Sequence, residues 1–580
     1  MDFLKDLNHQ QTQAVKAGPG PVLIVAGPGT GKTKTLTARI AYLLASGQAR
    51  PDEILALTFT NKAAAEMRER VVAAIGSAHN QPRIATFHAL CREMLSEHLG
   101  KPLIFIGQAE RVALIKDLRK TAAFKQLTTH ELATQISRAK NSLTPDYDEQ
   151  FTALLADYNA ALYRKGLHDF DDLLMQTHTL LTNAGVGKLR FRYLLIDEFQ
   201  DTSQLQYSLM QLLRATDNLF VIGDPKQSIY GFRGITDDMF ERFKTDFPHH
   251  KNIMLTTNYR STPQVVELGN AIFPEAPALR AHRQLDGTAA TVQVLNEYSE
   301  AAWIVDAIEQ ALGGTDFLRS HAASQAEDQT RQFRDYAVLY RTHRTAKVLQ
   351  RELDRSGIPY QVVGEGSPYE QSAVKTIIQT LRYLEYDAEL PELKDFSTAQ
   401  TRQLLAALRT KNPMLSTQLV HKIITTFGMA NEGSNLSQFM SALVRFDHEG
   451  IRSFLEYIDL ISEQVFYDPT ANVVTLLTIH AAKGLEFTQV FLLGTEQDIL
   501  PHAAGELDEE HRLFYVGATR AKDQLYLLHT KTRAGKNANL SQFAAALPEK
   551  ILPCTIDPHM AEQTRKLAIR RQKKSQTSLF

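Results

Sequence analysis

Two short segments of this chain combine residue types whose spacing suits chemistry on a polyphosphate. In AGPGTGKT the glycines let backbone N–H groups turn toward phosphate oxygens, Lys32 supplies a point charge, and the Thr33 hydroxyl can ligate Mg²⁺. The predicted loop comprises Ala26, Gly27, Pro28, Gly29, Thr30, Gly31, Lys32 and Thr33. The strict pattern has glycine where Ala26 stands, so a glycine-rich turn with a chance lysine is the alternative.

The second segment, LLIDEFQDTS at 194–203, delivers Asp197 and Glu198 directly after an apolar run. Such a run predicts a buried parallel strand, and ligands bind at the carboxyl ends of such strands. One carboxylate can hold Mg²⁺ together with Thr33, and the next can orient a water. A strand followed by Asp-Glu is weak evidence alone, but with a phosphate loop it predicts a nucleoside triphosphatase.

The elements that must position these segments alternate between strands and helices. The apolar runs PVLIVA, EILALTFT, FRYLLIDEF and NLFVIGD predict strands of one α/β core, and TVQVLN, DYAVLYR, VVTLLTI, TQVFLLG and QLYLLH those of a second. Helical patterns dominate about 89–167 and 387–470. We therefore predict two α/β cores, each interrupted by an all-helical insertion.

Composition limits the classes of protein that fit. With 580 residues, 43% hydrophobic and 22% charged, the chain is long enough for several domains of an ordinary globular protein. We expect neither a membrane span nor a signal peptide, and the two cysteines, Cys91 and Cys554, fit a reducing compartment such as the cytoplasm. The net charge of −1 means that any nucleic-acid site must be a local groove.

The order of motifs resembles the superfamily-1A DNA helicases, the UvrD/Rep/PcrA-like group, over about residues 7–528. The motifs are LNHQQTQAV at 7–15, AGPGTGKT at 26–33, TFTNKAAAEMRER at 58–70, TFHAL at 86–90, HDFDDLL at 168–174, LLIDEFQDTS at 194–203, VIGDPKQSIYGFRG at 221–234, LTTNYRS at 255–261, TIHAAKGLEF at 478–487 and EEHRLFYVGATRAK at 509–522. The resemblance implies two RecA-like P-loop lobes, with parallel sheets flanked by helices, that bind ATP between them. It also implies stepping along single-stranded DNA with 3′→5′ polarity, in repair or replication, in a bacterial cytoplasm.

On this resemblance the chain divides into five parts. The first lobe (1A) takes 1–88 and 168–258, and its helical insertion (1B) takes 89–167. The second lobe (2A) takes 259–386 and 471–548, and its helical insertion (2B) takes 387–470. A basic tail follows at 549–580. The second insertion is much shorter than is usual in the family and lacks an RGIG-type helix–hairpin–helix element, which puts duplex contact in question.

For the nucleotide, the resemblance implies contacts with the base, the ribose and the γ-phosphate. The matching residues are Gln11 for the adenine edge, Arg39 near the base, Tyr259 for adenine stacking, Glu486 for the ribose, Gln227 as γ-phosphate sensor, and Arg260 and Arg520 at the γ-phosphate. Arginine suits the last role because its planar fork is always charged. Lys32 and Mg²⁺ would offset charge while Glu198 acts as a base or positions the water. Gln11 has an alternative as a polar helix cap.

For DNA, the resemblance implies aromatic faces for bases and polar groups for phosphates. The matching residues are Phe59, Asn61, Thr86, His88, Tyr230, Phe232, Arg233 and His480. Family members usually carry Trp at the position of Phe232, so stacking is expected to be weaker here. Ordinary core packing is the alternative for the aromatic residues and for His480.

The expected partners are single-stranded DNA and its junctions with duplex, with the protein a monomer or weakly self-associating. The segment QTSLF resembles the motif by which bacterial proteins dock on a sliding clamp, through Gln576, Leu579 and Phe580, although an ordinary disordered tail is the alternative. Three other functions stay open: a translocase that displaces proteins with little unwinding, a nucleotide-switched clamp adaptor, and an RNA-directed motor.

Overall fold

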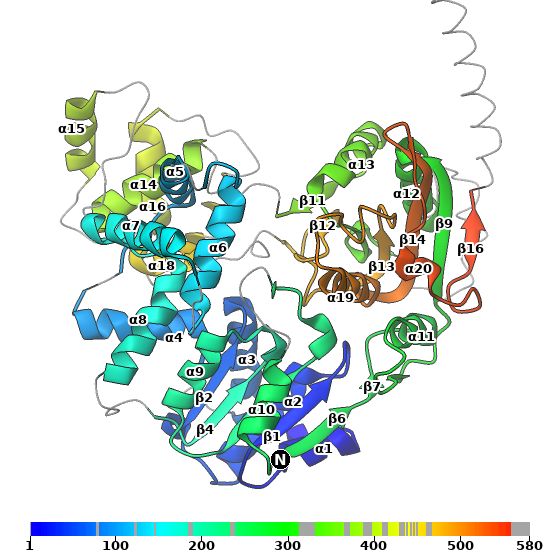
Figure 1. The fold of residues 1–580 in the computed structure, drawn as a ribbon, viewed down its shortest axis with the longest axis horizontal. Helices are drawn as coiled ribbons and strands as arrows, with labels where there is room; N and C mark the ends of the chain where they lie inside the picture. Colours follow the sequence, from blue (N-terminus) through cyan, green and yellow to red (C-terminus); the bar gives the residue numbers. More distant parts are fainter. Residues whose placement is uncertain are drawn as a thin grey trace, which may run out of the picture.

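The computed structural model describes most of the chain. The described residues are 2–76, 81–101, 103–120, 124–143, 147–183, 190–231, 238–312, 331–364, 372–386, 397–408, 416–428, 436, 439–440, 443–444, 447, 450–459 and 467–557. They form two α/β lobes and two helical groups (Figure 1). Within them, no helix is both long and apolar enough to cross a membrane.

The first lobe is built on a six-stranded parallel sheet in the order β3-β2-β4-β5-β1-β6. The strands are β1 (Val22–Ala26), β2 (Ile54–Thr58), β3 (Arg83–Thr86), β4 (Tyr193–Ile196), β5 (Leu219–Gly223) and β6 (Lys251–Leu255). Because both faces of the sheet are covered, β2, β4 and β5 are buried at every position, which explains their continuous apolar runs. The neighbours β4, β5 and β1 bring the two predicted nucleotide motifs to one edge.

Helices cover both faces of this sheet. They are α1 (His9–Val15), α2 (Lys32–Ala45), α3 (Asn61–Ile75), α9 (Gln204–Leu213) and α10 (Met239–Asp246). Three of them begin at capping residues that the sequence supplies: Asn8 with Gln11 forms a capping box at α1, Thr60 accepts from the N–H of Ala63 at α3, and Ser203 with Gln206 forms a capping box at α9.

The helical segment between β3 and β4 contains α4 (Phe87–Leu99), α5 (Gln108–Leu118), α6 (Thr129–Asn141), α7 (Glu149–Lys165) and α8 (Phe170–Asn183). Helices α4 and α8 share a core with the first sheet, whereas α5, α6 and α7 pack around a core of their own. Between these two groups, the buried ammonium of Lys140 lies 2.8 Å from carboxylate oxygens of both Asp169 and Asp172. This ion cluster fastens α6 to the start of α8.

The second lobe is built on an eight-stranded sheet whose main path runs β11-β12-β10-β13-β14-β9-β16, with β15 antiparallel beside β14. The strands are β9 (Thr288–Asn296), β10 (Tyr336–Tyr340), β11 (Tyr360–Val363), β12 (Val474–Thr478), β13 (Phe487–Leu492), β14 (Ala521–Arg533), β15 (Lys536–Asn537) and β16 (Cys554–Ile556). The helices are α11 (Pro263–Ile272), α12 (Glu297–Ala311), α13 (His343–Ser356), α19 (Leu507–Ala518) and α20 (Gln542–Ala545).

A two-stranded pairing of β7 (Thr257–Asn258) with β8 (Arg280–Ala281) follows β6, where the chain leaves the first sheet. The remaining helices, α14 (Ser372–Tyr386), α15 (Thr398–Leu408), α16 (Ser416–Thr426) and α18 (Ile451–Asp459), have their own apolar core, and Figure 1 shows them on the same side of the molecule as α5–α7. The two parallel sheets flanked by helices confirm the predicted α/β fold with two RecA-like lobes.

Candidate active site

The predicted phosphate loop curls between β1 and α2. Gly31, with φ of +81°, caps α2 in a left-handed conformation, and Gly29 has φ of +70°. The Lys32 ammonium donates to the carbonyl of Ala26 at 3.2 Å, and the Thr30 hydroxyl donates to the carbonyl of Gly27 at 2.8 Å. The first N–H groups of an α-helix have no acceptor within the helix, so the start of α2 beside this loop suits a phosphate.

The two predicted metal ligands meet at the edge of the first sheet. The Thr33 hydroxyl donates to Oδ2 of Asp197 at 3.2 Å, so the end of β4 reaches the start of α2. Burial, followed by the neighbouring charge of Glu198, raises the pKa of Asp197 to about 7. A hydroxyl beside a carboxylate is a donor set that fits Mg²⁺, whose charge favours the ionised carboxylate.

Glu198 occupies a left-handed backbone position with φ of +50°, which turns the chain sharply after β4. Its carboxylate accepts from Nε2 of Gln200, and Oε1 of Gln200 accepts from the N–H of Asp224 at 2.9 Å. Burial opposes the charge of Glu198, yet the nearby cations Lys32 and Lys483 hold its pKa below the usual value. Glu198 is therefore charged and fixed, as a residue that orients water must be.

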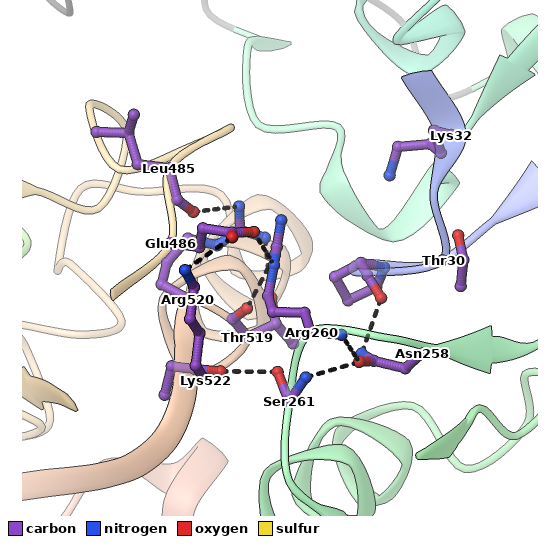
Figure 2. Close-up of polar contacts among 12 residues, drawn as sticks. Thr30, Lys32, Asn258, Arg260, Ser261, Leu485, Glu486, Thr519, Arg520 and Lys522 are labelled. Carbon is purple, nitrogen blue, oxygen red and sulfur yellow. Dashed lines mark hydrogen bonds and ion pairs between the residues drawn. The ribbon is translucent and has the colours of Figure 1, made fainter. Parts of the chain in front are cut away.

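Two arginines approach from the second lobe. Figure 2 shows Lys32 on one side and Arg260 and Arg520 on the other. Arg260 forms an ion pair of 2.6 Å with Glu486, and burial followed by the charge of Arg260 lowers the pKa of Arg520 to about 9. Nη2 of Arg520 lies 3.5 Å from Oε1 of Gln227, a residue of the first lobe.

The predicted base-binding residues fall into two places. Gln11 forms a capping box with Asn8, and its Nε2 also donates to the carbonyl of Thr30 at 3.0 Å, so it both caps α1 and touches the phosphate loop. Asn8 donates to the hydroxyl of Tyr259 at 2.7 Å, which places Gln11 and Tyr259 at one end of the site. Arg39 lies in the core of the first lobe, where it donates to the carbonyl of Val15 at 2.8 Å.

Several predicted DNA-contacting residues are brought together in pairs. The rings of Phe59 and Tyr230 stack with centroids 5.1 Å apart, and the Thr86 hydroxyl lies 3.2 Å from Oδ1 of Asn61. Tyr230 is only 7% exposed and belongs to the core of the second lobe, which favours the packing alternative for its ring.

His88 lies edge-on to Phe170, with centroids 6.3 Å apart, and His480 is half-buried after β12. Phe232, Arg233, Gln576, Leu579 and Phe580 lie outside the described residues. The roles given to these five residues stay predictions.

Asp201 and Lys483 form a buried ion pair that the sequence did not predict. Nζ of Lys483 lies 2.6 and 2.7 Å from the carboxylate oxygens of Asp201 and also donates to the carbonyl of Gln227. The same ammonium lies 4.9 Å from the centroid of the Tyr230 ring. The pair joins the motif around Glu198 to the AAKGLEF segment of the second lobe. Both partners stand inside recognised motifs, but only the fold pairs them.

Comparison with known proteins covers both lobes. Residues 7–248 match the UvrD/REP helicase N-terminal domain, and residues 253–390 and 392–532 match the UvrD-like helicase C-terminal domain. The chain is 30% identical to the ATP-dependent DNA helicase PcrA of Bacillus subtilis over 95% of its own length and 87% of the relative's. It is also 30% identical, over 95% of this chain and 86% of the relative, to the ATP-dependent DNA helicase UvrD1 of Mycobacterium bovis. The chain therefore belongs to the UvrD/Rep family of ATP-dependent DNA helicases.

Proposed function

We propose that this helicase hydrolyses ATP between its lobes and steps 3′→5′ along single-stranded DNA, acting in DNA repair or replication. The observation that carries the proposal is the meeting of two half-sites. Lys32, Thr33, Asp197 and Glu198 come from the first lobe, and Arg260 comes from the second. Neither lobe alone holds all of these groups, so closure of the cleft and hydrolysis are coupled.

In the proposed mechanism water attacks the γ-phosphate in line with the leaving group. Glu198 orients the water, Lys32 offsets the charge of the phosphates, and Arg260 and Arg520 stabilise the charge of the transition state. Thr33 and Asp197 would hold Mg²⁺, which supplies electrostatic stabilisation of the phosphate oxygens when bound. Arg260 must exchange its ion pair with Glu486 for a phosphate contact, which fits a contact made only in the closed state.

The remaining nucleotide contacts belong to the same proposal. Gln11 reads the adenine edge, Tyr259 stacks on the base, Glu486 contacts the ribose, and Gln227 senses the γ-phosphate. Asp224 supports the last role because its carboxylate accepts from Nε2 of Gln227 at 2.7 Å. Arg39 is buried and acts on the base indirectly: its hydrogen bond to the carbonyl of Val15 holds α1, the helix that carries Gln11.

Glu198→Gln tests the catalytic part of the proposal. The amide keeps the size and one acceptor of the side chain but loses its charge, so the variant should bind ATP and DNA while its turnover falls by roughly 10²–10⁴-fold. Single-turnover hydrolysis measured beside nucleotide and DNA binding separates the two effects. Full turnover in the variant would remove Glu198 from this role.

The polarity and product of the motor are tested with tailed substrates. Unwinding should require a 3′ single-stranded tail, and a duplex with a 5′ tail should stay intact. Displacement of a tightly bound protein from single-stranded DNA, measured under the same conditions, distinguishes a helicase from the alternative of a translocase with little unwinding. Stimulation of the ATPase by RNA as strongly as by DNA would contradict the DNA assignment.

Three further parts of the proposal rest on sequence. The chain divides at the boundaries given above into two lobes, two insertions and a tail, and it works in the cytoplasm as a monomer or with weak self-association. The segment with Gln576, Leu579 and Phe580 docks on a sliding clamp. Deleting residues 576–580 should abolish clamp binding and leave DNA-stimulated ATPase unchanged, and retained binding would assign the clamp contact elsewhere.

A further inference from the structure

Residues 225–231 follow a strand of the first lobe in the sequence, but this segment packs in the core of the second lobe. It follows β5 directly, yet Ile229 is fully buried in the core of the second lobe. Nε of Arg512, on α19, donates to the carbonyl of Ser228 at 2.7 Å, and Lys483 donates to the carbonyl of Gln227. Movement between the lobes must therefore either carry this segment along or break these contacts.

Lys226 is the cationic side chain of this segment, and it reaches into an aromatic cluster of the second lobe. Its ammonium lies 5.6 Å from the centroid of Phe273, which follows α11, and 5.5 Å from that of Tyr515 on α19. The two rings meet edge to face with centroids 5.3 Å apart, so they form two walls around the charge. Both distances are within the range of a cation–π interaction.

The surroundings of Lys226 act on its charge in two opposite directions, and burial has the larger effect. Burial lowers the pKa of Lys226, while the carboxylates of Asp224 and Glu275 act in the opposite direction. The ring of His511 packs at a tilt against Phe273 with centroids 4.5 Å apart, and burial lowers the pKa of His511, which favours its neutral ring. The ring of Phe543 stacks on His511 with centroids 4.9 Å apart and extends this aromatic cluster.

Lys226 immediately precedes Gln227, whose side chain joins Asp224 to Arg520. We propose that Lys226 is a positioning residue for ATP hydrolysis: its ammonium, held between Phe273 and Tyr515, fixes Gln227 against Arg520 as the lobes close. The inference rests on the proposed function of Gln227 and Arg520. The proposed contact of Lys226 with Phe273 and Tyr515 joins the two lobes and acts on hydrolysis only through the position of Gln227.

Lys226→Met removes the charge and keeps the length of the side chain. Because Lys226 does not contact the nucleotide, we expect kcat of the DNA-stimulated ATPase to fall about 5–30-fold while KM for ATP changes less than about 2-fold. Lys226→Arg keeps a cation over the rings and should retain activity within about 3-fold of wild type. Lys244→Met is the matched control, since Lys244 pairs with Glu241 on the surface of the same lobe.

A double-mutant cycle with Phe273→Leu tests the partner. If the ring and the cation act together, the variant carrying both Lys226→Met and Phe273→Leu should be no slower than the slower single variant. The inference is overturned if the two losses multiply, if Lys226→Arg is as slow as Lys226→Met, or if Lys226→Met matches wild type. Absence of DNA-stimulated ATPase in the wild type would instead refute the proposed function. In that case the same double-mutant cycle, measured on the urea midpoint of the full chain, would show whether Lys226 and Phe273 interact.

Discussion

The ion pair of Lys483 with Asp201 offers the sharpest test of how the lobes are joined. The two side chains are 6% and 1% exposed, and the ammonium contacts both carboxylate oxygens, at 2.6 and 2.7 Å. Lys483→Met removes the ammonium that contacts both oxygens of this buried carboxylate, at a cost of about 3–5 kcal/mol. Separation of the lobes returns the carboxylate to water, so the variant should relieve this cost by opening the cleft.

A cost of 3–5 kcal/mol shifts the ratio of docked to separated lobes by roughly 10²–10⁴-fold. Small-angle scattering should therefore report a larger radius of gyration for Lys483→Met than for wild type, and DNA-stimulated ATPase should fall with it. Lys120→Met is the control, because Lys120 contacts Asp117 at the same 2.7 Å distance but with side chains 73% and 70% exposed. Its loss should be at most about 1 kcal/mol of stability.

The second variant, carrying Lys483→Met and Asp201→Asn together, separates charge burial from lost packing. Asp201→Asn removes the carboxylate charge, and with it the free-energy cost of burial that favours separated lobes. The double variant should therefore be more compact and more active than Lys483→Met alone. Two results would refute the reasoning: a double variant as open as the single one, or a single variant indistinguishable from wild type in both measurements.

Three further outcomes follow from the described geometry and the sequence. Gly29→Ala should raise KM for ATP at least about 10-fold in steady-state ATPase assays, because the added Cβ would lie 2.7 Å from Cβ of Arg260 in a backbone conformation with φ of +70°. Phe232→Ala should reduce DNA-stimulated ATPase more than basal ATPase, and equal loss of both would favour core packing for this ring. Burial followed by the charge of Asp169 raises the pKa of Asp171 to about 6, so the native state loses stability as pH rises through that value. Asp171→Asn should therefore match wild type in urea unfolding near pH 4 and exceed it near pH 8, and a constant difference would contradict the shift.

Local pattern predicted those parts of the fold whose signal lies within one segment. The apolar runs that became β1, β4 and β5 are buried on both faces, so composition alone marked them as strands. The two edge strands have a weaker hydrophobic pattern, and the sequence did not predict them. Strand β6, KNIML, has exposed positions, and β3 is short. Helix α4 looked like the start of the insertion, yet it packs in the core of the first lobe because its apolar face meets α8 and the sheet.

The candidate site was predictable to the extent that its residues sit in recognised motifs. Thr33 and Asp197 are 164 residues apart, and their contact follows from the order of parallel strands. Lys483 and Asp201 are 282 residues apart and lie in different lobes, so their pairing depends on how the lobes dock, which no local pattern encodes. Arg39 shows that motif position alone does not fix the direction of a side chain. It lies on the helix after the phosphate loop, yet its guanidinium is buried in the core and donates to the carbonyl of Val15.

The segment after β5 concentrates the connections through which hydrolysis can be transmitted between the lobes. Gln200 links Glu198 to Asp224, Asp224 holds Gln227, and Gln227 meets Arg520 and Lys483 of the second lobe. Each step is a direct hydrogen bond, so a change in charge at the γ-phosphate need not pass through the cores of either lobe. The same segment continues into Tyr230, whose ring stacks on Phe59 of the first lobe, so the aromatic contact between the lobes lies three residues from Gln227.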